Sequence, residues 1–269
     1  DFHRYNENAL NFQIVINPIV QTFFGKGIWI NQMSQYGGYP YFFEPILKVV
    51  GLSILNITSI YALLMLASLS LFAYSLYKII DNKALLVFGF IGFLFIHFFS
   101  ASLWPYELYL QYYPTRILFP AICLFLGYHY LKKPSVKFYL ISISILTLGL
   151  IWCIDTGIFA LFAFLAATLY HIFSGEDKNI TKIKDIAYHF VYAALAIILT
   201  LSLFALYTKL RFESFLDFSK IVEIPFYYLG GGGKGVMNTW VYVKEGENIF
   251  HWQHAWVLGF FALITTVAY

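Results

Sequence analysis

Residues 138–173 read FYLISISILTLGLIWCIDTGIFALFAFLAATLYHIF, and this stretch decides the fold of the chain. It contains two apolar runs, residues 138–154 and 157–173, each close to the length that a helix needs to cross a bilayer. Only a turn that begins at Asp155 separates the two runs. The stretch therefore predicts an antiparallel hairpin of two transmembrane helices.

The composition of the whole chain indicates the same class. Hydrophobic residues make up 60% of the sequence and charged residues 12%, whereas soluble domains carry about 25% charged residues. A chain of 269 residues with so few charges is expected to be a polytopic integral membrane protein. The net charge of +3 does not indicate a nucleic-acid partner, because the lysines gather in short loops between apolar spans.

Six apolar spans are predicted in residues 57–208, which we expect to form the transmembrane core. They cover residues 57–79, 84–104, 116–131, 138–154, 157–173 and 187–208. A seventh apolar run begins near His254 and stops at the end of the sequence, so residues 254–269 predict a truncated span. We expect the chain to be a fragment that lacks at least one span before Asp1 and several after Tyr269.

The distribution of lysine predicts the orientation of the spans. Eight lysines lie in or beside three short loops: Lys78, Lys83, Lys132, Lys133, Lys137, Lys178, Lys182 and Lys184. Basic residues in short loops mark the cytoplasmic side of a membrane protein. Residues 1–56, 105–115, 155–156 and 209–253 are therefore expected to face outward.

The outward segment 1–56 is amphipathic, and its apolar runs are short for a membrane span. Residues 9–24 are apolar but carry several polar residues, which predicts a helix lying in the plane of the membrane surface. Residues 41–51 predict a second short amphipathic helix, with Gly51 as a candidate for its end. The predicted fold class is all-α: a polytopic transmembrane helix bundle with outward-facing, in-plane amphipathic helices.

Asp1 is the first candidate catalytic residue. It would lie where a preceding span leaves the bilayer, and desolvation at such a surface raises the pKa of a carboxylate. A raised pKa suits a general base that acts near neutral pH. The alternative is a solvated carboxylate at a helix end, and the neighbouring His3 and Arg4 favour a substrate-binding role for this segment.

Asp155 is the second candidate catalytic residue, because an ionisable group between two apolar runs is costly and often functional. The alternative is an N-cap, since Asp is a preferred residue immediately before a helix and Asp155 precedes the fifth predicted span. The two roles are compatible with each other.

Four further residues on the outward face are candidates for substrate binding. Arg116, at the start of a span, could bind a phosphate through two parallel hydrogen bonds, or could equally reach toward lipid headgroups. Glu107 lies on the same loop and could pair with Arg116, which would weaken the interpretation of Arg116 as a phosphate-binding residue. Lys26 stands in a Gly-Lys-Gly turn that lacks the spacing of a nucleotide-binding loop, and Glu44 is one of the outward carboxylates.

A metal site and a disulfide are not expected. His251 and His254 are spaced for one helical face and His3 could join them, but carboxylates are near in sequence only at Glu245 and Glu247. The two cysteines lie within apolar spans and have no metal-ligand spacing, so both predict buried thiols. We therefore expect no cofactor, and a divalent metal ion is the alternative.

Taken together, several motifs resemble those of the GT-C superfamily of bacterial integral-membrane glycosyltransferases. They are Asp1-Phe2-His3-Arg4-Tyr5, the turn Gly25-Lys26-Gly27, Ser34-Gln35-Tyr36-Gly37 and Trp152-Cys153-Ile154-Asp155-Thr156-Gly157. The resemblance covers roughly residues 1–160. This chain departs from the superfamily in having Asp-Phe-His-Arg in place of paired acidic residues, and residues 1–269 include no long soluble domain like the one that some members carry at the C-terminus.

The resemblance implies a transferase that takes a sugar from a polyprenyl-phosphate carrier at the outer face of the bacterial inner membrane. It assigns the essential acidic residue of the first outward loop to Asp1, which would deprotonate the acceptor hydroxyl. Arg116, with Arg4 or Lys26, would then hold the departing lipid phosphate. The expected partners are the lipid-linked sugar and membrane lipid.

Two other readings remain open. A transporter or flippase of lipid-linked saccharides would show charges or broken helices at mid-membrane and inverted repeats, none of which is evident in the sequence. A non-catalytic membrane scaffold would not need an acidic, aromatic outer face.

Overall fold

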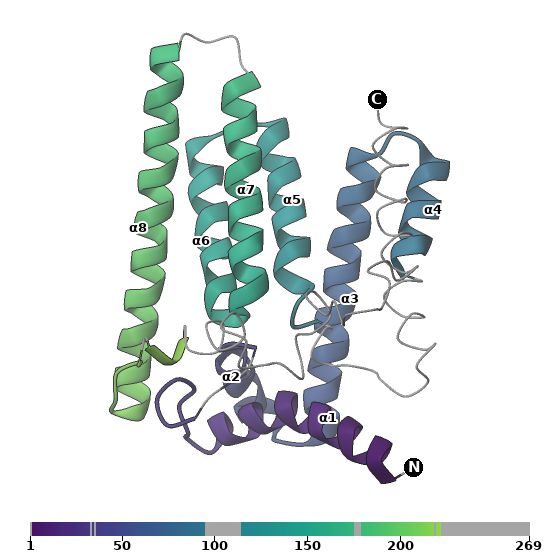
Figure 1. Cartoon of the computed structure of the whole chain (residues 1–269), viewed down its shortest axis with the longest axis vertical. Coiled ribbons are helices and arrows are strands. Elements are labelled where there is room, and N and C mark those ends of the chain that lie inside the picture. The colour runs from purple at the N-terminus through teal and green to yellow at the C-terminus, as the bar shows by residue number, and fades with distance from the viewer. Residues whose placement is uncertain are drawn as a thin grey trace, which may run out of the picture. The chain divides into compact units, whose positions relative to one another are not determined.

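A computed structural model of the chain describes residues 2–94, 114–174 and 179–221, apart from positions 33, 35 and 218. For residues 2–12 and 179–182 it describes the backbone alone. The structure is all-α, as predicted (Figure 1). Its helices are α1 (Phe2–Phe23), α2 (Pro40–Val50), α3 (Ile54–Ile79), α4 (Lys83–Leu94), α5 (Leu118–Lys132), α6 (Val136–Trp152), α7 (Ile154–Ser174) and α8 (Asn179–Phe212).

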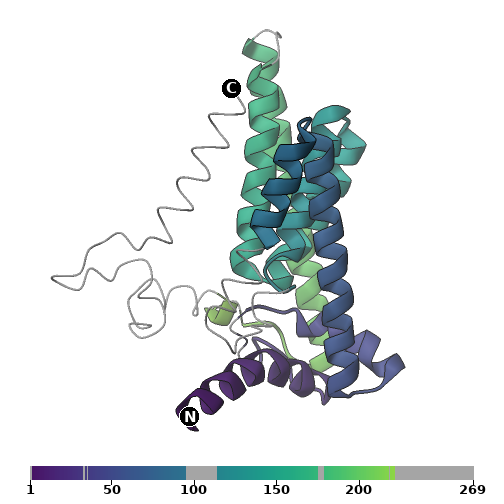
Figure 2. The same ribbon diagram turned by 90° about the vertical axis from the view of Figure 1, so that its right-hand side faces the viewer.

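Helices α3, α5, α6, α7 and α8 run alongside one another and form a bundle (Figures 1 and 2). Helices α3 and α7, and residues 183–212 of α8, are long and apolar enough to cross a membrane, and α4 and α6 are shorter apolar helices. Large apolar side chains also remain exposed along these helices, as a lipid-facing surface requires: they include Leu63, Leu66, Phe159, Phe162, Leu199 and Leu203. These features identify an integral membrane protein.

The predicted hairpin of residues 138–173 is confirmed, because α6 and α7 pack side by side and only Cys153 lies between them. Their backbones meet at two glycines. A Cβ atom placed on Gly157 would lie 2.2 Å from the carbonyl oxygen of Gly149, so no side chain fits there. Helix α7 begins at Ile154, three residues earlier than the apolar run at 157 predicted.

Short polar loops turn the chain between the bundle helices. The hydroxyl oxygen of Ser53 accepts a hydrogen bond from the backbone N–H of Asn56 at the start of α3, and Ser135 caps α6 in the same way through Phe138. The Asn82 side chain accepts bonds from Ala84 and Leu85 at the start of α4. These caps satisfy backbone donors that a membrane helix could not leave unpaired in lipid.

Helix α1 crosses the end of the bundle, where it packs against α2 (Figures 1 and 2). The Tyr39 hydroxyl donates a hydrogen bond of 2.7 Å to the Val15 carbonyl and so links the two helices. Helix α2 ends at Gly51, as predicted: its φ of 90° is left-handed, and its N–H donates to the Leu47 carbonyl at 2.8 Å. Placement across the bundle end is what a helix at a membrane surface would show.

A cluster of buried aromatic residues joins α2 to the bundle. Phe43 stacks on Trp152 with ring centroids 6.1 Å apart, and contacts the ring of Tyr61 in α3 at 4.8 Å. Tyr39 and Phe119 also contact the Trp152 ring. The Trp152 Nε1–H donates to the Thr115 carbonyl at 2.8 Å, which fixes the residues immediately before α5 to the end of α6.

Both predicted boundaries of the span 187–208 were wrong, because α8 extends from Asn179 to Phe212. Residues 209–212 were assigned to an outward loop, but α8 continues through Phe212. The reason is that Lys209 and Arg211 lower the local hydropathy without ending the helix; basic residues are favourable in a last helical turn. Of the predicted span 84–104, residues beyond Leu94 lie outside the described part of the chain, as does the predicted span 254–269.

Candidate functional site

The structure brings two of the predicted site residues together at the end of the bundle that α1 and α2 cover. Arg116 lies just before α5 and Asp155 in the first turn of α7, and their Nη2 and Oδ2 atoms are 3.0 Å apart. Both side chains remain accessible, with exposed fractions of 31% for Arg116 and 42% for Asp155. This is a charged pair that a polar ligand could reach.

Asp155 uses its second carboxylate oxygen to hold the α6–α7 junction. Its Oδ1 accepts a hydrogen bond of 2.7 Å from the backbone N–H of Thr156 and one of 2.8 Å from the Cys153 thiol. The predicted bond to an N–H of this helix is therefore present. The predicted cap position was wrong, because α7 begins at Ile154 and Asp155 is a residue of its first turn. A negative charge in the first turn stabilises a helix by interacting favourably with the helix dipole.

Tyr36 provides the aromatic side of the site. The Arg116 guanidinium lies over the Tyr36 ring, 5.2 Å from its centroid, and Tyr36 is buried. A guanidinium held by both a carboxylate and a ring face has a fixed orientation.

Backbone hydrogen bonds attach the Tyr36 loop to the end of α6. The N–H of Gly38 donates to the Ile151 carbonyl at 2.6 Å, and that of Tyr39 to the Trp152 carbonyl at 3.1 Å. Gly37 has a φ of 114°, and a Cβ atom there would lie 2.8 Å from the Trp152 carbonyl oxygen. Glycine at this position is therefore what brings two distant sequence motifs, residues 34–37 and 152–157, into contact.

Glu44 belongs to a second ionic group at the same end of the bundle. Its side chain is only 2% exposed, and its Oε1 contacts Lys48 at 2.6 Å and the Nη2 of Arg211 at 2.7 Å. Its Oε2 accepts a hydrogen bond from the Tyr207 hydroxyl at 3.2 Å. Burial raises the pKa of Glu44, but the bonds from Lys48 and Arg211 outweigh it and hold the pKa below its ordinary value. Both oxygens are engaged and the side chain is buried, so Glu44 ties α2 to α8 and is not accessible to a substrate.

Lys26 stands apart from both ionic groups. It is exposed on the turn that follows α1, where Gly25 has a φ of 86° and the Lys26 N–H donates to the Gln21 carbonyl at 2.9 Å. The predicted turn is confirmed. Among the described residues, Lys26 forms no ion pair with Asp155 or Glu44.

An apolar groove lies beside the Glu44 group, between α2, α6 and α8. Its volume is about 260 Å³, and it is lined by Tyr41, Phe42, Leu148, Ile151, Thr200, Leu203, Phe204 and Tyr207. Tyr207 lines the groove and also bonds to Glu44, so the apolar surface is continuous with the ionic group.

Several predicted site residues lie outside what the structure describes. They are Asp1, the side chains of His3 and Arg4, Glu107, His251 and His254. In the described ranges, no group of three or more His, Cys, Asp or Glu side chains is placed to hold a metal ion. Cys123 and Cys153 are buried free thiols, as predicted.

The sequence did not reveal Tyr207, Arg211 or Lys48 as members of an ionic group. The only available signal was spacing: Glu44 and Lys48, and likewise Tyr207 and Arg211, are four residues apart and so share a helix face. Comparison of the chain with protein families, with curated proteins and with solved structures gives no match.

Proposed function

We propose that this chain is a membrane glycosyltransferase that moves a sugar from a polyprenyl-phosphate donor to an acceptor at the outer face of the membrane. The observation that carries the proposal is the Arg116–Asp155 pair, which is accessible at a bundle end and oriented by the Tyr36 ring. Arginine presents a planar fork of donors that matches the geometry of a phosphate.

In this proposal the acceptor hydroxyl oxygen attacks the anomeric carbon of the sugar, and the bond from that carbon to the phosphate oxygen breaks. The proton of the hydroxyl passes to a carboxylate, for which Asp1 is the candidate. The lipid phosphate leaves with the bonding electron pair, and Arg116 stabilises its charge. Attack from the side opposite the leaving group inverts the anomeric configuration.

Asp155 positions Arg116 for this task. Its two oxygens connect the guanidinium to the backbone of α7, so the cation is held at the bundle end. The apolar groove between α2, α6 and α8 supports the proposal further, because an isoprenoid chain needs an apolar surface to lie on.

A transporter of the same lipid-linked saccharides is the second candidate, and the charge distribution favours it less. Transport sites are built from charges or broken helices near the bilayer midplane. In the described helices of the bundle, every Asp, Glu, Lys and Arg lies within the first or last two turns. The described charges thus suit chemistry at a membrane surface.

The experiment that tests the proposal measures sugar transfer from a polyprenyl-phosphate donor by membranes containing the full-length protein. Arg116→Ala should lower the rate by roughly 10²-fold or more, since a positioned donor to a developing oxyanion contributes on that scale. Arg116→Lys should recover only part of the rate, because lysine keeps the charge but loses the fork. Asp1→Asn should cost about 10²–10⁴-fold, as removal of a general base does.

Lys209→Ala is the matched control, since Lys209 is an exposed cation at the same bundle end and contacts only Glu213 and Phe215 among the described residues. It should stay within about twofold of the wild type. If folded Arg116→Ala protein transfers sugar at nearly the wild-type rate, Arg116 does not bind the leaving phosphate. Loss of lipid-linked sugar flipping in Arg116→Ala, with transfer intact, would favour the transporter.

A further inference from the structure

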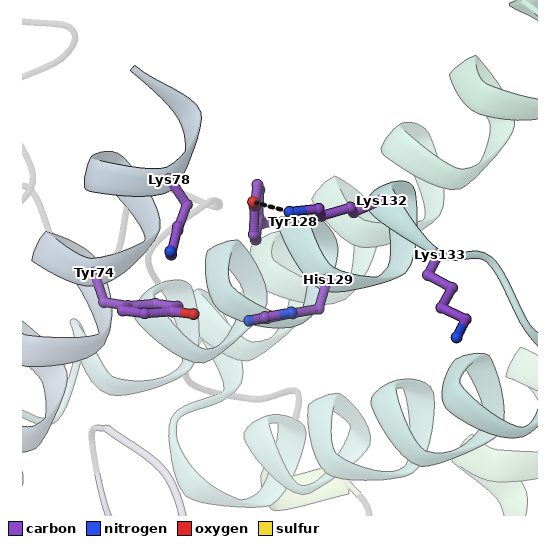
Figure 3. Close-up of a pocket in the computed structure, with 6 residues that line it drawn as sticks. All are labelled: Tyr74, Lys78, Tyr128, His129, Lys132 and Lys133. Atoms are coloured by element: carbon purple, nitrogen blue, oxygen red, sulfur yellow. Dashed lines mark hydrogen bonds between the residues drawn. The ribbon is translucent and has the colours of Figure 1, made fainter. Parts of the chain in front are cut away.

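A basic pocket lies at the end of the bundle opposite α2, between the last turns of α3 and α5 (Figures 1 and 3). Its volume is about 410 Å³, and it is lined by Tyr74, Lys78, Tyr128, His129, Lys132 and Lys133. The pocket thus combines three cations with three aromatic rings.

The helix repeat places the cations beside the rings. Lys78 follows Tyr74 by four residues and Lys132 follows Tyr128 by four, so each lysine lies one turn beyond a tyrosine on the same face. The Lys78 Nζ is 5.5 Å from the Tyr74 ring centroid, and the Lys132 Nζ is 3.4 Å from the Tyr128 hydroxyl, to which it donates.

The rings of Tyr74 and His129 form the floor of the pocket. They are nearly parallel, with an interplanar angle of 15° and centroids 6.0 Å apart. Figure 3 shows Lys78 and Lys132 on the same side of this floor. The Nε2 atom of His129 is buried without a hydrogen-bond partner among the described residues. The floor of the pocket therefore contains a ring nitrogen that could form a hydrogen bond.

The lysines of the pocket form no ion pair in the described part of the chain. None of Lys78, Lys132 and Lys133 forms an ion pair within 4.0 Å there, and Asp81, in the loop after α3, contacts none of them. Three ammonium groups around one cavity give it a positive potential, which favours the binding of an anion.

We propose that this pocket binds the phosphate group of an anionic phospholipid in the cytoplasmic leaflet. The lysine-rich helix ends mark the cytoplasmic membrane surface, where basic pockets between membrane helices recognise anionic headgroups. Tyr74 is 40% exposed, so the pocket opens along α3 to the lipid-facing surface, where acyl chains would lie. The inference rests on the membrane placement of the bundle and is independent of the transferase proposal.

The test measures lipid binding to the purified full-length protein, delipidated in a neutral detergent, by native mass spectrometry with added phosphatidylglycerol. The double variant Lys78→Gln/Lys132→Gln should bind the lipid more weakly, by roughly fivefold for each lysine removed, since one lysine near an anionic surface contributes on that scale. The double variant Lys137→Gln/Lys184→Gln is the matched control. It removes the same charge from exposed lysines at the same bundle end that do not line the pocket.

The control should stay within about twofold of the wild type, and both variants should keep their melting temperatures in neutral detergent. Equal weakening in both variants would mean that general surface charge attracts the lipid, and the pocket assignment would be lost. No weakening in the pocket variant would also overturn it. If inorganic phosphate displaces phosphatidylglycerol at equal free concentration, the ligand is soluble phosphate and the lipid assignment is wrong.

Discussion

Glu44 is a carboxylate that stays charged although its side chain is almost fully buried. Two cations and a tyrosine hydroxyl surround it, and they come from one turn further along α2 and from the last turns of α8. A buried charge is tolerated only when such partners replace its lost hydration. The ionic group therefore links two helices that are more than 150 residues apart in the chain.

We predict that Glu44→Gln lowers the free energy of unfolding by about 2 kcal/mol, the scale on which hydrogen bonds to charged groups contribute. The neutral amide of glutamine cannot neutralise the positive charges of Arg211 and Lys48 as the carboxylate does. Thermal unfolding in one detergent measures the change. Glu213→Gln is the control, because Glu213 is exposed; its effect should be within about 0.5 kcal/mol.

We also predict that the stabilisation by Glu44 depends on pH. Because the bonds from Lys48 and Arg211 hold the pKa of Glu44 below its ordinary 4.5, the charged group stabilises the fold above that pH. This stability is lost as the pH falls through the lowered pKa. The difference in melting temperature between wild type and Glu44→Gln should be constant from about pH 7 to about pH 5 and should shrink below the ordinary pKa. A difference in melting temperature that grows as the pH falls would contradict a lowered pKa of Glu44.

Among individual residues, the sequence indicated Arg116 and Asp155 separately but not their pairing. They are 39 positions apart, and Glu107 was an equally reasonable partner for the arginine. Which carboxylate reaches Arg116 depends on how α5 and α7 pack, and this packing cannot be predicted from a single sequence. Arg211 was missed for a simpler reason, since its charge made a helix end resemble a loop.

At the scale of elements, the hairpin of α6 and α7 was predicted correctly because two long apolar runs with a two-residue polar break have few other arrangements in a bilayer. The close approach of the two helices was not predictable. Gly149 and Gly157 are ordinary glycines in the sequence, and only the structure shows that their backbones touch.

We predict that Gly157→Ala destabilises the protein by about 1–3 kcal/mol, because overpacking forces α6 and α7 apart. The added Cβ atom would lie 2.2 Å from the Gly149 carbonyl oxygen, a distance that no side chain adopts. Unfolding in detergent, followed by circular dichroism, measures the effect.

Gly127→Ala is the matched control for this substitution. Gly127 lies inside α5, and a Cβ atom there would meet nothing within 4 Å. Alanine is the better helix former by about 0.5–1 kcal/mol, so this variant should be as stable as the wild type or more stable. Equal destabilisation by the two substitutions would show that the close approach at Gly157 is not the cause.

At the scale of the whole molecule, the two bundle ends differ in chemistry. One end carries α1, α2 and the Arg116–Asp155 pair, and the other carries the lysine loops (Figure 1). Composition was enough to predict the all-α membrane class. The concentration of lysines in short loops was enough to predict which segments lie at the same end of the bundle. The six-span core stays a prediction, because α5 has only 15 residues and α4 is described only as far as Leu94.

We predict that the end carrying α1 and α2 faces outward. Cysteine introduced at the exposed position Asn31 should react with a membrane-impermeant maleimide on intact cells, and cysteine at the exposed Lys137 should react only after lysis. The wild type is the control, since its two cysteines are buried and should not react. Labelling at 137 and not at 31 would reverse the orientation and remove the outer-face site.

The single residue between α6 and α7 also constrains how the protein is made. Cys153 is buried and leaves no hydrophilic loop that could cross the membrane ahead of α7. Alone, α6 spans roughly 25 Å, somewhat less than the hydrocarbon core. We therefore expect the two helices to leave the translocon as a pair. A ribosome stalled within α7 would then hold an unfinished hairpin whose glycine contacts have not formed.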